Sequence, residues 1–423
     1  MKVLVVGSGG REHAIVWKLS QSRHVDKIYC TPGNAGIADI AECISVDTSD
    51  FKGLIDFVKY DWIDLTFVGP EEPLSRGIVD AFEKEGRKIV GPTKDAAQLE
   101  SSKVFSKDFM RRYKIPTAEY KVFSSHPQAE DYVRMKGAPI VIKADGLAAG
   151  KGVIVASTVD EAIKAIRLIM KDRAFGDAGD RIVVEECLQG EEASFMAFTD
   201  GITIVPMVSS QDHKRVYDQD KGPNTGGMGA YSPAPVVTKE LEELVMEKVM
   251  KPTVLGMKSE GIVFKGILYA GLMIKDGVPN VLEFNCRLGD PETQPVLMRL
   301  DSDFYEICDA IACQKLSEIN ISWKDEAAVC VVLASGGYPG KYDKGKIISG
   351  LDEAAKVADS FVFHAGTSFE NGKIATNGGR VLGVTATGAD IAAAKAKAYE
   401  AVSKISFEGM HYRKDIADRA IKR

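Results

Sequence analysis

A carboxylate, an amide and an arginine alternate along one apolar segment of this chain. Glu283, Asn285 and Arg287 occupy every second position, so an extended backbone would point all three side chains to one face. Carboxylate and amide oxygens are typical magnesium ligands, and a guanidinium binds phosphate or carboxylate oxygens. With Asp290 and Glu292 just beyond, the segment predicts a place where a metal ion, phosphate groups and a carboxylate are held together.

A second element is suited to phosphate binding. Residues 143–152, Lys-Ala-Asp-Gly-Leu-Ala-Ala-Gly-Lys-Gly, are rich in glycine and carry a lysine near each end. Glycines let backbone N–H groups approach phosphate oxygens, and the lysines add positive charge. A Walker A sequence is absent, so the P-loop class is disfavoured. The residues predicted to close over a triphosphate are Lys143, Gly146, Gly150, Lys151 and Gly152.

Both elements also have a plainer interpretation. The first would be an edge strand whose polar face meets water, and the second an ordinary hairpin. A solvated face gives no reason for an amide between two charged residues, whereas a glycine loop taken alone is as often a hairpin as a ligand clamp. Because two separate elements predict the same ligand, we favour ATP-dependent chemistry.

A third segment could contact the rest of a nucleotide. An apolar strand that begins at Arg181 ends in Glu185 and Glu186, and further carboxylates follow in residues 189–194. Exposed backbone at a strand end can pair with an adenine edge, and a carboxylate can accept hydrogen bonds from ribose hydroxyls. An ordinary acidic turn is the alternative, which would be preferred without the other elements.

The polar loop 209–233 is suited to closing over a substrate, because it combines alternating charge around Asp212 with the glycines Gly226 and Gly227. His213 in this loop could carry a proton. A lone histidine is more often a hydrogen-bonding surface residue, so it is given no catalytic role.

The first turn of the chain begins a dinucleotide-binding pattern but does not complete it. Gly7 and Gly9 match the first two glycines of GxGxxG, whereas Glu12 stands in place of the third. A dinucleotide cofactor is therefore disfavoured. Free N–H groups at a helix N-terminus, together with Arg11, would still suit a single phosphate.

Composition excludes several classes of function. The chain has 423 residues, of which 45% are hydrophobic and 27% charged, and a formal net charge of -6. This length and composition predict a multi-domain globular protein. Its net negative charge does not provide the positive surface potential that nucleic-acid binding requires. No apolar run is long enough for a membrane span, and the first residues are unlike a signal peptide, so a cytoplasmic location is expected. The seven cysteines form no CxxC pair, which predicts reduced thiols and neither disulfides nor zinc.

Hydrophobic periodicity indicates several lobes. The first hundred residues alternate short β-branched runs with amphipathic stretches, which is typical of βαβ units around a parallel sheet. A helix is expected at 102–113, a small lid at 121–188, paired strands at 266–274 and 278–285, and a hairpin through residues 377–379. We predict an α/β (α+β multi-domain) protein divided into an N-terminal α/β lobe at 1–101, a central region at 102–325 and a mostly β lobe at 326–423.

Read together, three motifs resemble the phosphoribosylamine-glycine ligase family, enzymes of purine biosynthesis within the ATP-grasp superfamily. They are Lys143 to Gly152, Asn224-Thr-Gly-Gly-Met-Gly-Ala-Tyr231 and Leu282-Glu-Phe-Asn-Cys-Arg-Leu-Gly-Asp-Pro-Glu-Thr-Gln294. The resemblance extends from Val3 to Val384. It implies an ATP-grasp core with a lid, flanked by the N- and C-terminal lobes, with ATP between lid and core.

The resemblance also implies roles for individual residues. ATP is a co-substrate and Mg²⁺ or Mn²⁺ the cofactor. By motif position, the phosphate contacts are Lys103 and Lys143, the adenine contacts are Glu185 and the backbone of Glu186 and Leu188, the ribose contact is Glu192, and the metal ligands are Glu283 and Asn285.

The implied reaction joins glycine to 5-phosphoribosylamine through glycyl phosphate, giving glycinamide ribonucleotide, ADP and phosphate. Lys143 and Arg287 would neutralise charge on the transferred phosphoryl group. The phosphoribosyl group would span the interlobe cleft, although a tight βα turn and a hairpin tip are the plainer interpretations of two of its contacts. The expected substrate contacts are Gly9, Gly10, Arg11, Asp212, Gly226, Gly227, Arg287, Asp290 and Arg380.

Three alternatives remain open at this point. Another ATP-grasp ligase for a different carboxylate would use the same nucleotide site. A nucleotide-binding oxidoreductase would depend on the N-terminal lobe alone, and a non-catalytic nucleotide sensor on the lid. The missing third glycine and the intact set Glu283, Asn285 and Arg287 count against the last two. A monomer or weak homo-oligomer is expected.

Overall fold

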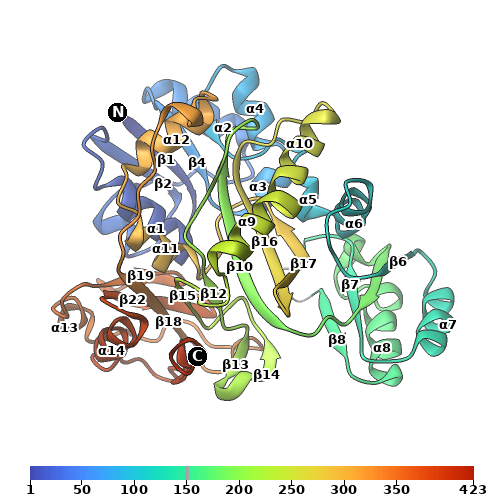
Figure 1. Cartoon of the computed structure of the whole chain (residues 1–423). Coiled ribbons are helices and arrows are strands. Elements are labelled where there is room, and N and C mark those ends of the chain that lie inside the picture. Colours follow the sequence, from blue (N-terminus) through green and yellow to red (C-terminus); the bar gives the residue numbers. More distant parts are fainter. Residues whose placement is uncertain (148–151) are drawn as a thin grey trace.

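The computed structural model describes residues 1–147 and 152–423. A long antiparallel sheet runs through the centre of the molecule, with the N-terminal region above it and the C-terminal region below, and a small four-stranded body lies to one side (Figure 1). Among the described residues, no helix combines the length and apolar character that crossing a membrane requires.

The N-terminal region is a parallel sheet covered by helices, which confirms the predicted βαβ pattern. The apolar run of β1 is buried on both faces because helices pack on each side. The strands, in spatial order, are β3 (Glu42–Cys43), β2 (Lys27–Pro32), β1 (Lys2–Gly7), β4 (Leu65–Val68) and β5 (Ile89–Val90). The helices are α1 (Gly10–Leu19), α2 (Phe51–Tyr60), α3 (Glu71–Ser75) and α4 (Ile78–Lys84).

The body at the side has its own sheet and core. Two helices cover one face of the sheet (Figure 1), and their apolar side chains pack with those of the strands in a separate cluster. The strands, in order, are β6 (Tyr120–Phe123), β9 (Ile182–Glu186), β7 (Ile140–Ala144) and β8 (Val153–Ala156). The helices are α7 (His126–Lys136) and α8 (Val159–Ile166).

The central sheet is antiparallel and includes the paired strands predicted near 266–285. Its strands, in order, are β11 (Ile204–Pro206), β10 (Glu191–Thr199), β16 (Gly266–Lys275) and β17 (Val278–Asn285). The helices nearby in sequence are α5 (Gln98–Ser101), α6 (Lys103–Arg112), α9 (Lys239–Val245), α10 (Lys251–Ser259), α11 (Thr293–Arg299) and α12 (Phe304–Ala312). The helix expected at 102–113 is thus confirmed as α6.

The C-terminal sheet recruits two strands from the polar loop 209–233. Its order is β12 (Gln211–Asp212), β15 (Gly229–Ser232), β18 (Ala327–Ala334), β22 (Arg380–Gly388) and β19 (Ser360–His364). Two small sheets pair β13 (Arg215–Tyr217) with β14 (Lys221–Asn224) and β20 (Thr367–Glu370) with β21 (Lys373–Thr376). Three helices complete the region: α13 (Leu351–Ala354), α14 (Ile391–Val402) and α15 (Asp418–Ile421).

Two expectations about this region were wrong. About half of the loop 209–233 is strand, and the buried backbone of β15 finds its partner in β18. Residues 377–379 do not form a hairpin turn, since β21 pairs with β20 whereas β22 pairs with β18 and β19. The glycine at 378 instead permits close backbone approach, as a Cβ there would lie 2.8 Å from the Cα of Gly366.

A buried histidine pair joins the N-terminal helix α1 to the C-terminal strand β19. The Nδ1 atom of His13 accepts a hydrogen bond of 2.7 Å from the backbone N–H of His364. Its ring meets Phe361 and Phe363 edge-on, with centroids 5.6 and 5.7 Å away. Burial and the neighbouring His364 lower the pKa of His13 to about 3, and burial lowers the pKa of His364 to about 4.

This pair predicts a pH dependence of stability. Below the ordinary histidine pKa of about 6.5 the unfolded chain binds protons that the folded chain does not, so stability is lost as the pH falls from 6.5 towards 3. Replacing His13 by Asn should reduce the slope of unfolding free energy near pH 5 by about 1.4 kcal/mol per pH unit. Urea titrations between pH 4.5 and 6 measure this slope. His126→Asn, at a side chain that is 41% exposed, is the control, and an unchanged slope in His13→Asn would contradict the assignment.

Candidate active site

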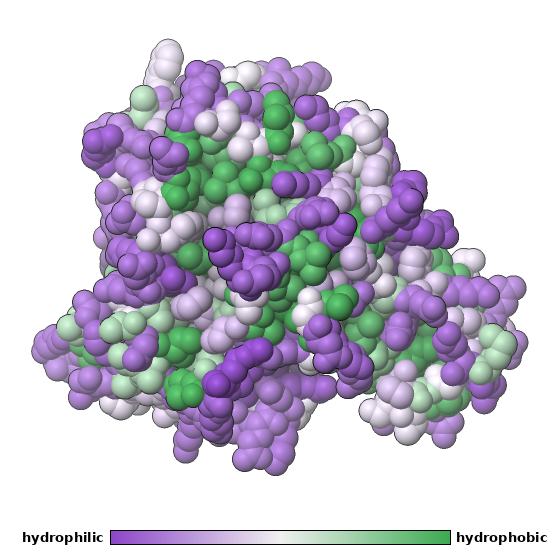
Figure 2. Space-filling model, in the orientation of Figure 1, coloured by the Kyte–Doolittle hydropathy of each residue, from purple (hydrophilic) through white to green (hydrophobic). Residues whose placement is uncertain are grey.

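One cavity of about 570 Å³ collects most of the residues predicted to bind nucleotide and substrates. The view in Figure 2 shows a notch between the side body and the rest of the molecule, and side chains from both line the cavity. The predicted residues that line it are Arg11, Lys103, Lys143, Gly146, Gly152, Glu185, Glu186, Leu188, Glu192, Asp212, Gly226, Glu283, Asn285, Arg287, Asp290, Glu292 and Arg380.

The remaining predicted residues fall into two groups. The cavity lining, as far as the structure describes it, does not include Gly9, Gly10 or Gly227. Gly150 and Lys151 fall outside the described residues. The predicted closure of the glycine loop over a triphosphate therefore remains a prediction.

The oxygen donors predicted for a metal lie at the end of β17. Strand alternation buries Phe284 in the core and leaves Glu283 and Asn285 lining the cavity. Burial opposes ionisation of Glu283, but Lys103, Lys214, Lys143 and Arg287 together lower its pKa to about 2. A charged carboxylate beside an amide oxygen is a donor set that suits a hard divalent cation.

Arg287 is fixed by two acidic side chains that sequence reasoning missed. Its Nη2 lies 2.7 Å from Oε1 of Glu100, and its Nε lies 3.2 Å from Oε2 of Glu71. Nη2 also donates to Oδ1 of Asn285 at 3.2 Å. Burial opposes the charge of Arg287, but Glu100 and Glu71 raise its pKa further above the ordinary value, so the cation is retained. Glu71 could have been suspected, because it follows the predicted strand 65–68 at the rim where parallel sheets bind ligands.

A third missed residue, Lys107, belongs to a buried group of charges beneath the side body. Both Lys107 and Lys143 form ion pairs with the carboxylate of Glu185. Lys107 also donates to Oγ1 of Thr117 at 2.7 Å, and Lys143 to the carbonyl oxygen of Leu282 at 2.9 Å. Lys107 lies four residues after Lys103 on α6, a spacing that places both lysines on one helix face. This spacing is the sequence feature from which a role for Lys107 beside Lys103 could have been predicted.

The position of α6 is set by the segment that leads into the glycine loop. Asp145 accepts hydrogen bonds from the hydroxyl of Ser102 at 2.9 Å and from the backbone N–H of Val104 at 3.1 Å. Ser102 in turn caps the helix by accepting from the N–H of Phe105. The start of α6, with Lys103, is therefore linked directly to the end of β7 that carries Lys143.

Removing Lys107 should destabilise the protein. The Lys107→Met variant leaves Glu185 with one cation in place of two, and breaking a buried ion pair typically costs about 3–5 kcal/mol. We expect a loss at the lower end of that range, because Lys143 stays. Urea unfolding measures it, with Lys59→Met as control, since the pair of Lys59 with Glu85 is exposed and such pairs contribute about 1 kcal/mol or less. Equal losses in both variants would contradict the proposed role.

The other end of the cavity is held by Arg380, at the start of β22. Its Nη2 lies 3.0 Å from Oδ2 of Asp290, and its Nη1 donates to the carbonyl oxygens of Asp290 and Gly226 at 2.6 and 2.7 Å. One arginine thus ties the C-terminal sheet to the segment after β17 and to the glycine run 226–229. Arg11 approaches the same segment, donating to the carbonyl oxygen of Leu288 at 3.3 Å.

The N-terminal turn is closed by Glu12, in place of the third glycine of a dinucleotide motif. Its Oε2 accepts from the N–H of Gly9 at 2.6 Å, and its Oε1 pairs with Nε of Arg11 at 2.6 Å. A Cβ at Gly7 would lie 2.5 Å from Cγ of Glu12, which shows how closely this side chain covers the turn. The N–H of Gly9 is therefore already engaged, and the expected binding of a phosphate at this helix N-terminus remains a prediction. An oxidoreductase with a dinucleotide on this turn is also disfavoured, because a carboxylate already occupies it.

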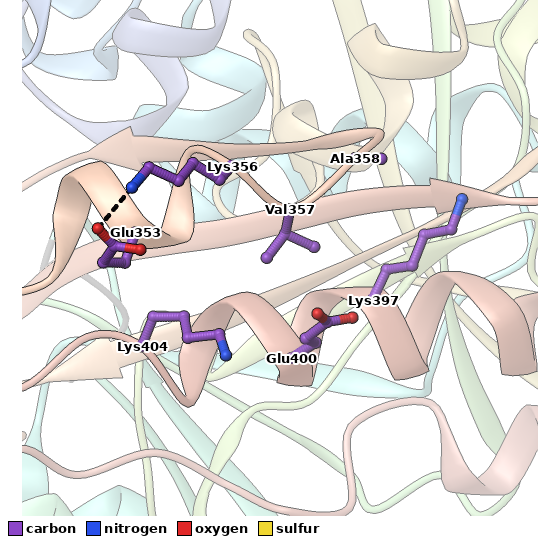
Figure 3. Close-up of a pocket in the computed structure, with 7 residues that line it drawn as sticks. All are labelled: Glu353, Lys356, Val357, Ala358, Lys397, Glu400 and Lys404. Carbon is purple, nitrogen blue, oxygen red and sulfur yellow. Dashed lines mark hydrogen bonds and ion pairs between the residues drawn. The ribbon is translucent and has the colours of Figure 1, made fainter.

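A second depression lies on the C-terminal region, beside α14 and the loop after α13 (Figure 3). Its charged side chains are mainly exposed, and Lys356 pairs with Glu353, three residues before it on the same wall, at 2.6 Å. None of the residues predicted for chemistry lines it. The lining residues are Glu353, Lys356, Val357, Ala358, Lys397, Glu400 and Lys404.

Comparison with known families matches this architecture along nearly the whole chain. The family models for phosphoribosylglycinamide synthetase match residues 1–100 (N domain), 101–293 (ATP-grasp domain) and 328–419 (C domain). The chain belongs to the phosphoribosylamine-glycine ligase family. It is an ATP-dependent ligase of purine biosynthesis, of a class that uses ATP with a divalent metal ion.

Similar family members are found in several bacteria. The phosphoribosylamine-glycine ligase of Neisseria meningitidis serogroup A is 56% identical over 425 residues, covering 100% of both chains. That of Vibrio parahaemolyticus is 55% identical over 426 residues, covering 100% of this chain and 99% of the relative. The crystal structure of the Thermotoga maritima family member superposes with a TM-score of 0.86 at 34% identity, covering 99% of this chain and 100% of that one.

The same fold occurs outside the family. The biotin carboxylase domain of the Hydrogenobacter thermophilus 2-oxoglutarate carboxylase has a TM-score of 0.74 at 15% identity, covering 97% of this chain and 91% of that one. At this identity the likeness concerns the ATP-grasp fold alone.

Proposed function

We propose that this chain ligates glycine to 5-phosphoribosylamine at the expense of ATP, with the cavity described above as the active site. The observation that carries the assignment of the site is the convergence of Glu283, Asn285 and Arg287 with two lysines from other elements, Lys103 and Lys143. An ionised carboxylate, an amide and three fixed cations are what a transferring phosphoryl group requires.

The chemistry follows from the weakness of a carboxylate as an electrophile. Transfer of the γ-phosphoryl group of ATP to glycine would give glycyl phosphate, whose phosphate is a good leaving group for attack by the amine. Lys143 and Arg287, which both line the cavity, would neutralise the phosphoryl oxygens. Arg287 is held in place by Glu100 and Glu71, so little reorganisation would be needed during the reaction.

Glu283 and Asn285 would hold the metal ion, which we propose to be Mg²⁺ or Mn²⁺. The low pKa of Glu283 keeps its carboxylate ionised at neutral pH, as a metal ligand must be. When bound, the ion would polarise phosphoryl oxygens as a Lewis acid. Two ligands from the protein leave the remaining positions for phosphate oxygens and water, as is common for Mg²⁺.

The nucleotide would lie between the side body and β17. Because the carboxylate of Glu185 pairs with two lysines, the groups left for adenine are the backbone atoms of Glu186 and Leu188. Glu192 is proposed to contact the ribose. Its Oε2 lies 2.6 Å from Nζ of Lys214, which leaves its second carboxylate oxygen to accept from a hydroxyl.

The phosphoribosyl group is proposed to lie at the opposite end, where Arg11 and Arg380 line the cavity. Arg380 forms a hydrogen bond with Gly226 and an ion pair with Asp290, so the segments that carry these three residues would move together when the sugar binds. The N-terminal glycines Gly9 and Gly10 contribute through the shape of the turn that presents Arg11.

The decisive assay is ADP release with ATP, Mg²⁺ and one carboxylate at a time, with and without phosphoribosylamine. We expect turnover that requires both glycine and the amine. Turnover with bicarbonate or with another amino acid in place of glycine would favour a different ATP-grasp ligase, and amine-independent ATP hydrolysis at the same rate would overturn the proposed function.

A further inference from the structure

Asp212 is a buried carboxylate at the cavity wall that the steps above leave without a task. It is the last residue of the edge strand β12 and is 8% exposed. Asp212 lines the cavity. Within residues 1–147 and 152–423, no group donates a hydrogen bond to its carboxylate. A buried acceptor without a donor is costly, and in an enzyme such a group is often reserved for a ligand.

The backbone of Asp212 is held from two sides. In the sheet it pairs with Ala230 of β15, and its carbonyl oxygen accepts from Nη2 of Arg419 in α15 at 2.6 Å. The next residue, His213, accepts at Nε2 from the N–H of Ala417 at 3.0 Å. The C-terminal segment therefore fixes the backbone position of Asp212, whose carboxylate has no partner among the described residues.

Charged side chains from both ends of the cavity act on Asp212. The charges acting on it come from Lys214 and Glu192 on the nucleotide side and from Glu292, which is two residues after Asp290, on the sugar side. The carboxylate of Glu292 is itself fixed by the hydroxyls of Ser194 and Tyr269, each at 2.9 Å. The charge of Lys214 is engaged by Glu192 at 2.6 Å. In the described part of the chain, the carboxylate of Asp212 therefore lines the cavity with neither an ion-pair nor a hydrogen-bond partner.

We propose that Asp212 is the general base that removes a proton from the amine of 5-phosphoribosylamine as it attacks glycyl phosphate. This inference rests on the proposed function. The amine nitrogen forms a bond to the acyl carbon, the bond from that carbon to the phosphate oxygen breaks, and phosphate leaves with the electron pair. The nitrogen, which then carries an extra proton, transfers it to the carboxylate of Asp212 and becomes a neutral amide.

The electrostatic surroundings of Asp212 suit this task. Burial, together with Glu292 and Glu192, raises the pKa of Asp212 to about 7, against the lowering effect of Lys214 and Arg419. A general base is most effective when its pKa is near the working pH. The titratable and charged groups that face it are Lys214, Glu192, Glu292, Tyr231, Tyr269 and Arg419.

The test separates activation of glycine from attack by the amine. Hydroxylamine, a small and strong nucleophile, intercepts glycyl phosphate as glycine hydroxamate and reports its formation. In Asp212→Asn we expect hydroxamate formation within about threefold of wild type, whereas amide formation with phosphoribosylamine falls by about 10²- to 10⁴-fold, the usual contribution of general base catalysis. Asp212→Glu should recover part of the amide-forming rate.

The control is Glu247→Gln, which removes an exposed carboxylate paired with Lys248 at 2.9 Å, away from the cavity, and should leave both rates unchanged. Amide formation that stays within threefold in Asp212→Asn would overturn the proposal. So would an equal loss of both products with a raised KM for glycine, since that result describes a glycine-binding residue. Failure of wild type to form hydroxamate from glycine would instead remove the proposed function itself.

A measurement on the wild type keeps the proposal testable if the variant does not fold. Phosphoribosylamine and hydroxylamine are compared at equal concentrations of their unprotonated forms at each pH. The rate of amide formation divided by the rate of hydroxamate formation should then fall about tenfold per pH unit below pH 7, because protonated Asp212 cannot act as a base. A ratio that is flat between pH 5.5 and 8 would overturn the proposal.

Discussion

The Arg287→Ala variant should form glycinamide ribonucleotide about 10²- to 10³-fold more slowly than wild type, with the affinity for ATP largely kept. The reason is that Arg287 offers its charge to the phosphoryl group mainly as charge develops in the transition state, and loss of one such group typically has this effect. Steady-state rates of ADP release and a nucleotide-binding titration measure the two quantities. Near-normal turnover would refute the assignment.

Because Arg287 pairs with a buried carboxylate, its replacement also affects stability, and a second substitution at that carboxylate serves as the control. Alanine at this position leaves Glu100, which is 4% exposed, without its cation. An unpaired buried charge costs about 3–5 kcal/mol, so part of the loss could be structural. The double variant Arg287→Met, Glu100→Gln removes both charges and should recover stability in urea without recovering activity. Recovery of activity along with stability would show that Arg287 serves the fold alone.

The Glu283→Ala variant should lose about 10³-fold in rate at ordinary magnesium concentrations, because the proposed ion loses its only protein carboxylate. The variant also leaves Lys103, 3.6 Å away, without its partner. Glu283→Gln separates the two effects, since it keeps an oxygen ligand but not the charge. The measurement is the rate of ADP release as a function of magnesium concentration. We expect Glu283→Gln to need a higher magnesium concentration for half-maximal rate, and Glu283→Ala to show little activity at any magnesium concentration.

The control for this series is Glu260→Ala, which removes a carboxylate that pairs with Arg112 at 3.0 Å, away from the cavity. It should leave the magnesium dependence unchanged. Intact synthesis in Glu283→Ala would exclude Glu283 as a metal ligand and would remove the main support for the site.

Much of the fold could be predicted from local pattern. The alternation of apolar runs and amphipathic stretches in residues 1–100 gave the parallel sheet, because a strand buried on both faces and a helix buried on one have different periods. The two strands that became β16 and β17 were found in the same way. The pattern was misleading at residues 377–379, where a glycine pair that looks like a hairpin turn joins strands of two different sheets.

Many residues of the candidate site could be predicted from the sequence, but the ion pairs between them could not. Spacing of two along β17 put Glu283 and Asn285 on one face, since side chains alternate in any extended strand. The partners of Arg287 could not be found in this way. Glu71 and Glu100 lie 216 and 187 residues away along the chain, and no local periodicity relates them to it.

The sequence by itself determined the types of side chain available for phosphate and metal binding and the short elements that carry them, because both follow from residue type and local spacing. Only the tertiary structure decided which charges are paired and which stay free. Glu185 is neutralised by Lys107 and Lys143, the Gly9 N–H donates to Glu12, and Asp212 has no side-chain partner in residues 1–147 and 152–423. Pairing depends on distances between elements far apart in sequence, and those distances are fixed by how the sheets pack together.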